Sequence, residues 1–180
     1  MKGQIFTLLS EMVIEGYGME VWNQILEKAS PESKGSYTSG GQYPSTELMA
    51  IVKAASENIG IPPNKLVRQF GNFLFLHLYN SSPVSSESDL SLKEFLLKVD
   101  SAIHKEVKRI NPDVYLPTFE YRSNDTNQLT IFYQSKRKLC ELCHGLLEAS
   151  ADHFDEKISI AHDECMHRGE PRCRFDIIFH

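Results

Sequence analysis

The sequence lacks the features that mark membrane-spanning, exported and nucleic-acid-binding proteins. No run of about eighteen apolar residues occurs, so no segment is predicted to span a bilayer. An apolar stretch follows Lys2, but Glu11 and Glu15 interrupt it and no small-residue cleavage site comes after it, which argues against a secretory signal. The 180 residues carry a formal net charge of -5, whereas nucleic-acid binders usually carry a basic patch. We expect neither membrane nor nucleic acid among its partners.

Cysteine is scarce, with four residues in the chain. In a protein without an export signal, cysteines lie in the reducing cytoplasm, where they bind metals more often than they form disulfides. Hydrophobic residues make up 41% and charged residues 24%, as in an average globular protein, and the length fits one domain. We therefore expect a cytoplasmic single-domain protein, residues 1–180, whose cysteines are candidate metal ligands.

The spacing of apolar residues predicts helices in the first two thirds of the chain and strands in the last third. Ser91 and Glu94 form a capping box that begins a helix running to Val107. The other helices are expected over residues 5–13, 21–26, 48–55, 66–78 and 138–154, with loops at 35–44 and 80–88. Strands are expected over residues 118–122, 128–134, 157–160 and 174–179, with a hairpin turn at 123–125.

These elements predict the α+β class. A helical N-terminal part, about residues 1–60, packs on a second part, about residues 61–180. The second part contains an antiparallel four-stranded sheet and one long helix.

Tyr133, Ser135 and Arg137 stand two residues apart. On extended backbone, this spacing places the three side chains on one face. Two hydroxyls and a guanidinium suit an anion, because arginine offers a two-pronged donor to carboxylate or phosphate. Taken alone, however, the triplet is more often a solvated strand face.

His104 lies at the edge of the apolar stripe of its helix, one residue past Ile103 and one turn after Asp100. A lone histidine in such a place is more often a core residue than a ligand. Neutral imidazole is also the usual protein ligand of haem iron.

A helical histidine followed about thirty residues later by Tyr-x-Ser-x-Arg resembles the haem nitric oxide/oxygen-binding (H-NOX) family. The resemblance covers essentially the whole chain, including Met1–Gly3, Ala102–Val107, Leu116–Pro117, Tyr133–Arg137 and Glu148–Ser150. It implies a haem b buried between the helical part and the sheet, with His104 as the iron ligand. Tyr133, Ser135 and Arg137 match the residues that bind the two propionates, and Pro117 matches a proline that bends the porphyrin.

The resemblance also implies which gas is bound. Oxygen-binding members place a tyrosine at the position of Leu142, supported by an asparagine and a tryptophan at the positions of Leu74 and Leu9. All three are leucines here, and Ile5 is expected beside them, so no side chain in this set can donate a hydrogen bond to oxygen. We predict that the protein binds nitric oxide, binds carbon monoxide more weakly and excludes oxygen.

A second candidate metal site comes from the residues Cys140, His162, Cys165 and Cys173. Three thiolates and one imidazole suit structural zinc, and the turn at Gly169–Pro171 lets the last two cysteines approach each other. Free thiols are the alternative, and Cys143 or His167 remain open as replacement ligands. By resemblance, a subset of bacterial H-NOX proteins carries zinc at the matching positions. Oxidation of such a cluster would release the metal, which gives the hypothesis of a redox response.

By resemblance, nitric oxide breaks the bond between iron and His104, and the resulting change regulates a separate partner. Stand-alone bacterial members act on a histidine kinase or a cyclic-di-GMP enzyme. We therefore expect a sensor and not an enzyme. A haem oxidase would need distal acid–base groups where the three leucines stand. A haem-free regulatory module of the vinyl-reductase type shares the cysteine pattern, but His104 and the Tyr-Ser-Arg triplet argue against it.

Overall fold

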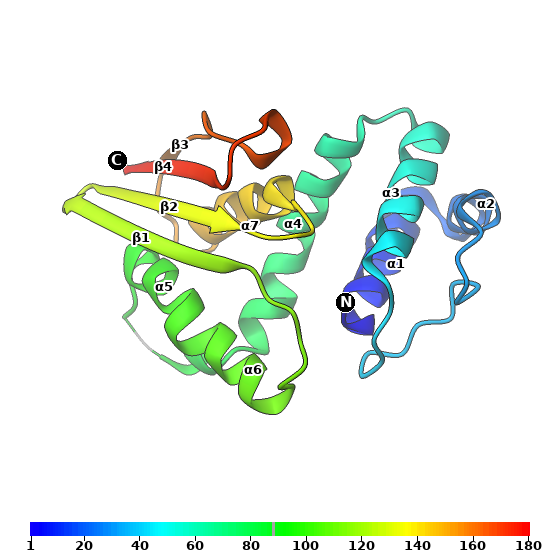
Figure 1. Cartoon of the computed structure of the whole chain (residues 1–180), viewed down its shortest axis with the longest axis horizontal. Coiled ribbons are helices and arrows are strands. Elements are labelled where there is room, and N and C mark those ends of the chain that lie inside the picture. The colour runs from blue at the N-terminus through cyan, green and yellow to red at the C-terminus, as the bar shows by residue number, and fades with distance from the viewer. Residues whose placement is uncertain (88) are drawn as a thin grey trace.

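The N-terminal part of the chain is helical, as its apolar spacing predicts (Figure 1). The computed structural model describes residues 1–87 and 89–180, without the side chain of Asn124. Its first helices are α1 (Gly3–Tyr17), α2 (Met19–Ala29), α3 (Ser45–Ile59) and α4 (Pro63–Asn80). Gly18 separates the first two with a φ of 90°, a conformation that favours glycine. No helix among the described residues is long and apolar enough to cross a membrane.

Helix α4 contributes buried side chains to two hydrophobic cores. Leu66, Phe70 and Leu74 pack with α1, α2 and α3 in the N-terminal core. Phe75, the next residue, packs with the sheet and the C-terminal helix instead. The predicted division near residue 60 therefore falls just before a helix that both parts share.

The C-terminal part contains the predicted antiparallel four-stranded sheet, in the order β1-β2-β4-β3. Its strands are β1 (Thr118–Asp125), β2 (Gln128–Gln134), β3 (Ile158–Ala161) and β4 (Cys173–Phe179). The hairpin turns at Thr126 and Asn127, so the predicted turn at 123–125 is wrong. A register shift between Arg122 and Asp125 extends β1 past the residues that looked like a turn.

Helix α7 (Cys140–His153) packs along α4 (Figure 1). Two glycines lie where the helices meet. A Cβ on Gly145 would overlap the carbonyl oxygen of Arg68, and one on Gly71 would overlap that of Leu142. Only glycine allows the two backbones to approach this closely.

The helix predicted from Ser91 to Val107 begins as expected but does not continue regularly. Its capping box is present: the Glu94 amide donates to Ser91 Oγ at 3.3 Å, and Glu94 Oε2 accepts from the Ser91 amide at 2.9 Å. The helix then divides into α5 (Leu92–Lys98), a π-helix η2 (Val99–His104) and α6 (Lys105–Ile110). No residue from Val99 to Ile110 is fully buried, but Val99, Ala102 and Ile103 of the π-helix pack as partly buried side chains against the C-terminal core.

Two short 3₁₀ helices complete the structure, η1 (Pro83–Ser86) and η3 (Met166–Arg168). The first lies inside the loop predicted over residues 80–88. The last residue of that loop, Ser88, lies outside the described residues.

Candidate functional site

An apolar cavity of about 140 Å³ lies beside His104, between α4, η2, β1, β2 and α7. Most of its lining is aliphatic or aromatic, with Phe75, Phe119 and Leu146 as examples. His104 is the one lining residue that has a nitrogen lone pair to offer.

The His104 ring is oriented by Asp100, one turn earlier in the π-helix. His104 Nδ1 lies 3.2 Å from Asp100 Oδ1, and the ring centroid lies 5.4 Å from that of Phe119. Burial lowers the pKa of His104, while Asp100 acts in the opposite direction. A neutral imidazole whose Nδ1 donates to a carboxylate keeps the Nε2 lone pair free for a metal. The donor and the apolar walls therefore fit a haem.

The Tyr-Ser-Arg triplet lies at the end of β2. Tyr133 and Ser135 are buried, and Arg137 is partly exposed. The strand ends at Gln134 and the chain then turns, with the Lys138 amide donating to the Ser135 carbonyl oxygen at 3.1 Å. The strand therefore ends where the sequence predicts, at Gln134, and the extended spacing that would place all three side chains on one face does not continue to Arg137.

The three side chains nevertheless keep O–H and N–H groups that can donate hydrogen bonds to an anion. The Arg137 amide donates to Ser135 Oγ at 3.2 Å, which folds the turn around the serine hydroxyl. Burial raises the pKa of Tyr133, so its hydroxyl stays protonated and able to donate. Two hydroxyls and a guanidinium therefore gather at the end of one strand.

The predicted gas-facing residues gather in the N-terminal core. Leu9 and Leu74 are buried there, and Leu142 and Ile5 pack against it. None of these four described residues lines the cavity beside His104. Leu142 does adjoin that cavity through its neighbours on α7, because Cys143 and Leu146 line it.

Pro117, the residue matched to the porphyrin-bending proline, lies directly before β1. Phe119, two residues further along, lines the cavity and packs on the His104 ring.

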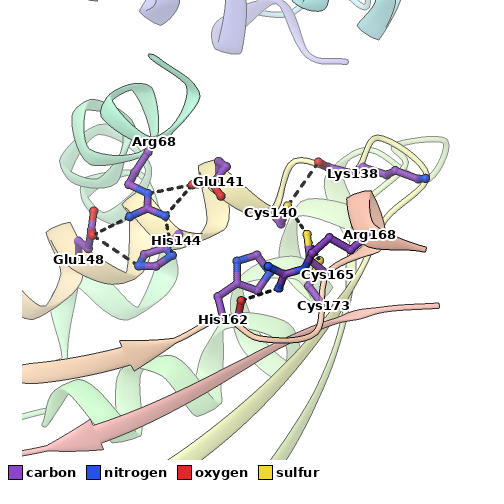
Figure 2. Close-up of polar contacts among 10 residues, drawn as sticks. All are labelled: Arg68, Lys138, Cys140, Glu141, His144, Glu148, His162, Cys165, Arg168 and Cys173. Carbon is purple, nitrogen blue, oxygen red and sulfur yellow. Dashed lines mark hydrogen bonds and ion pairs between the residues drawn. The ribbon is translucent and has the colours of Figure 1, made fainter. Parts of the chain in front are cut away.

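Figure 2 shows that the second predicted site comes together from α7 and the segments around η3 and β4. The ligand atoms of Cys140, His162, Cys165 and Cys173 all lie within 4.8 Å of one another. Cys165 Sγ lies 3.7 Å from Cys140 Sγ and 3.8 Å from Cys173 Sγ. In a tetrahedral site with zinc–sulfur bonds of about 2.3 Å, neighbouring sulfurs are about 3.8 Å apart.

The chemistry of these four residues fits a metal cation. His162 Nε2 is buried and has no hydrogen-bond partner among the described residues. Burial raises the pKa of Cys140 and of Cys173, and the neighbouring Cys165 raises both further, while the Met166 amide lowers that of Cys173. A bound cation would offset this cost and stabilise the thiolates.

The two residues left open as replacement ligands lie elsewhere. His167 Nε2 is 2.8 Å from the Lys138 carbonyl oxygen, a distance at which it donates a hydrogen bond. Cys143 is buried in the wall of the cavity beside His104, and this burial raises its pKa to about 12. Neither belongs to the group of four.

A polar network that the sequence reading missed joins α4 to α7 beside this cluster (Figure 2). Arg68 Nε donates to Glu141 Oε2 at 2.9 Å, and Arg68 Nη2 lies 3.0 Å from His144 Nδ1. Glu148 Oε1 lies 3.6 Å from Arg68 Nη1 and 3.5 Å from His144 Nε2. The spacing of three and four between Glu141, His144 and Glu148 indicates that they share a helix face. Their partner Arg68 lies 73 residues before Glu141, so the local sequence does not predict the network.

The fold and the site together define a class: a haem-binding domain in which one neutral histidine faces an apolar cavity between a helical part and a four-stranded sheet. The family model described as Haem-NO-binding matches residues 2–162, which include His104 and Arg137. The chain belongs to this haem-NO-binding, or H-NOX, family, whose members are haem-based sensor domains for nitric oxide and related gases.

Solved structures agree with this assignment over the full length of the chain. An H-NOX protein from S. oneidensis in the Fe(II)NO ligation state is 34% identical, with a TM-score of 0.90, covering 100% of this chain and 99% of that one. The Fe(II) unliganded H-NOX protein from K. algicida is 29% identical, with a TM-score of 0.91, covering 100% and 97%.

The soluble guanylate cyclase gcy-37 of Caenorhabditis elegans is 26% identical over 156 residues. The match covers 84% of this chain but 22% of the cyclase, so this chain corresponds to a small part of that protein.

Proposed function

We propose that this protein is a nitric oxide sensor in which His104 is the protein ligand of a ferrous haem. The observation that carries the proposal is the His104 imidazole, neutral, held by Asp100 and facing an apolar cavity. A bound haem would supply the ferrous iron at which the gas binds. The chain supplies an oriented imidazole, walls that exclude water, and a cationic and hydroxyl clamp for carboxylates at Tyr133, Ser135 and Arg137.

The choice of gas rests on the residues predicted to face it. Leu9, Leu74 and Leu142 have no N–H or O–H group, so they cannot stabilise the partial negative charge of bound oxygen. Nitric oxide needs no such donor. We expect carbon monoxide to bind more weakly and oxygen to be excluded.

The output would be a movement of the segment that carries His104. The π-helix packs on the C-terminal core through the partly buried Val99, Ala102 and Ile103, and no residue of α6 is buried, so a displacement would break a limited set of apolar contacts. A ligand that favours one position of such a segment shifts its population, which is what a switch requires. The proposed receiver is a separate cytoplasmic protein, a histidine kinase or a cyclic-di-GMP enzyme.

We also propose that Cys140, His162, Cys165 and Cys173 bind one structural zinc ion. Three thiolates and an imidazole leave no open position for a substrate, as in structural zinc sites. The site would hold the start of α7 against the segment that precedes β4. Metal analysis of the purified protein should find one zinc per chain, and a chain free of metal would contradict this proposal.

Absorption spectroscopy of the reduced protein tests the sensor proposal. We expect a ferrous haem band that shifts when nitric oxide is added and stays unchanged when air is admitted. A protein that takes up no haem would refute the proposal. A stable complex with oxygen would refute the assigned gas but leave the role of His104 intact.

A further inference from the structure

Tyr115 makes an unusual set of contacts for a residue that is 37% exposed. It lies in the link between α6 and β1, two residues before Pro117. Its hydroxyl oxygen accepts a hydrogen bond from the Lys136 amide at 2.7 Å. Its carbonyl oxygen accepts one from Arg137 Nη1 at 2.9 Å, and its ring centroid lies 4.9 Å from Arg137 Cζ.

These contacts fix the Arg137 guanidinium on one face and at one edge. Arginine has five N–H donors in a planar fork, and the bond from Nη1 to the Tyr115 carbonyl uses one of them. The remaining donors stay available to a carboxylate. An arginine side chain that is already ordered loses less conformational entropy when it binds an anion. Tyr115 therefore prepares Arg137 for binding.

Tyr115 also lies close in sequence to the segment that carries His104. Helix α6 begins directly after His104 and ends at Ile110, and four residues separate Ile110 from Tyr115. The first residue of this link is tied to the N-terminal part, because Lys2 Nζ donates to Asn111 Oδ1. Tyr115 is therefore joined to α6 by a link of four residues.

We propose that Tyr115 is a positioning residue that holds Arg137 in place for the haem propionates and links it to the segment that carries His104. This inference rests on the proposed haem-binding roles of Arg137 and His104. It adds a residue that lies outside the Tyr-Ser-Arg triplet.

The first test uses the haem-free chain. The side-chain Nε–H signal of Arg137 should carry a ring-current shift in the NMR spectrum, because the guanidinium lies over the Tyr115 ring. In Tyr115→Leu this shift should disappear, and in Tyr115→Phe it should persist. An unchanged Arg137 signal in the leucine variant would overturn the proposal whether or not the chain binds haem.

The second test measures haem release into excess apomyoglobin. Loss of the cation–π contact in Tyr115→Leu should speed release about fivefold, whereas Tyr115→Phe should stay within about twofold of the wild type. The propionate bending bands of the resonance Raman spectrum should shift in the leucine variant alone. Tyr17→Leu is a matched control, because Tyr17 is 39% exposed and lies on α1.

A double-mutant cycle separates positioning from a general loss of stability. With Arg137→Gln already present, Tyr115→Leu should cause no further increase in haem release. An equal acceleration in both backgrounds would overturn the proposal. If the wild-type chain takes up no haem, the proposed function fails, while the NMR result still decides whether Tyr115 holds Arg137.

Discussion

The region around His104 and the cluster around Cys165 offer their ligand atoms in opposite ways. His104 is a single ligand, held by one carboxylate, on a segment in which no residue from Val99 to Ile110 is buried. The cluster brings four ligand atoms within 4.8 Å, and its three cysteines are buried. The proposed roles differ accordingly: the His104 segment would move, and the cluster would hold a metal ion in a fixed geometry. Variants in each region test this contrast.

The largest effect is expected from Cys165→Ala. Cys165 is the sulfur that approaches both other thiols, so its loss should remove the zinc and the constraint the zinc supplies. We expect a loss of at least about 3 kcal/mol in the free energy of unfolding, measured by urea denaturation, with zinc content measured in parallel. Cys143→Ala is the control, which should keep its zinc. A Cys165→Ala protein with full zinc content would show that the cluster does not hold the metal.

A somewhat smaller effect is expected from His104→Gly. Without its protein ligand, the haem should bind at least about a hundredfold more weakly, which is about 2.7 kcal/mol. Free imidazole should restore the ferrous spectrum, because the glycine leaves space for it beside the cavity. The exposed His77, changed to glycine, controls for the cost of glycine in a helix. Wild-type haem affinity in His104→Gly would remove His104 from the haem site.

Asp100→Ala should weaken haem binding by about tenfold, since loss of a partner that orients a metal ligand typically costs this much. The His104 ring should also lose its fixed orientation, which the iron–histidine stretching band in the Raman spectrum reports. Asp113→Ala, at an exposed position in the link after α6, serves as the control. If both variants behave alike, the contact at 3.2 Å contributes nothing to the site.

The smallest effect is a pH dependence at the α4–α7 contact. Burial and then Arg68 lower the pKa of His144, whose Nδ1 accepts from the Arg68 guanidinium only when the imidazole is neutral. Below about pH 6.5 the unfolded chain takes up a proton that the folded protein resists, so the wild type loses stability as the pH falls. His144→Gln lacks this loss. The free energy of unfolding of His144→Gln, relative to that of the wild type, should therefore rise by no more than about 1 kcal/mol between pH 7.5 and pH 5.5. Urea denaturation at both pH values measures this difference. A difference that stays the same at both pH values would show that the pKa of His144 is not lowered in the folded protein.

The sequence predicted most of the fold because its signals are local. The capping box at Ser91 and Glu94, the alternation in β2 and the cysteine spacing are each visible within a short stretch of chain. The cluster could be predicted because the soft ligands that suit zinc come from a small set of residue types. The same local pattern wrongly predicted a hairpin turn at 123–125. In the structure a register shift lets β1 continue through these residues to Asp125.

The contacts that the sequence did not predict join distant residues. Arg68 meets Glu141 across 73 positions, and Arg137 meets Tyr115 across 22. No local periodicity encodes either pair, since each depends on how α4, α7 and the β1 link pack. The π-helix was missed for a related reason. Its residues continue the apolar spacing of a helix, and no local signal distinguishes the wider turn from an α-helical one.

The direction in which the His104 side chain points depends on the number of residues in the π-helix, as well as on the side chains packed around it. In an α-helix each residue rotates the backbone by about 100°, so adding or removing one residue turns everything after it onto a new face. The wider turns of Val99–His104 set the direction in which His104 leaves the helix. In this stretch the wider turn already holds one residue more than an α-helical turn, so deletion of a single exposed residue such as Ser101 would let it close as an α-helix and would place Asp100 three residues before the imidazole instead of four.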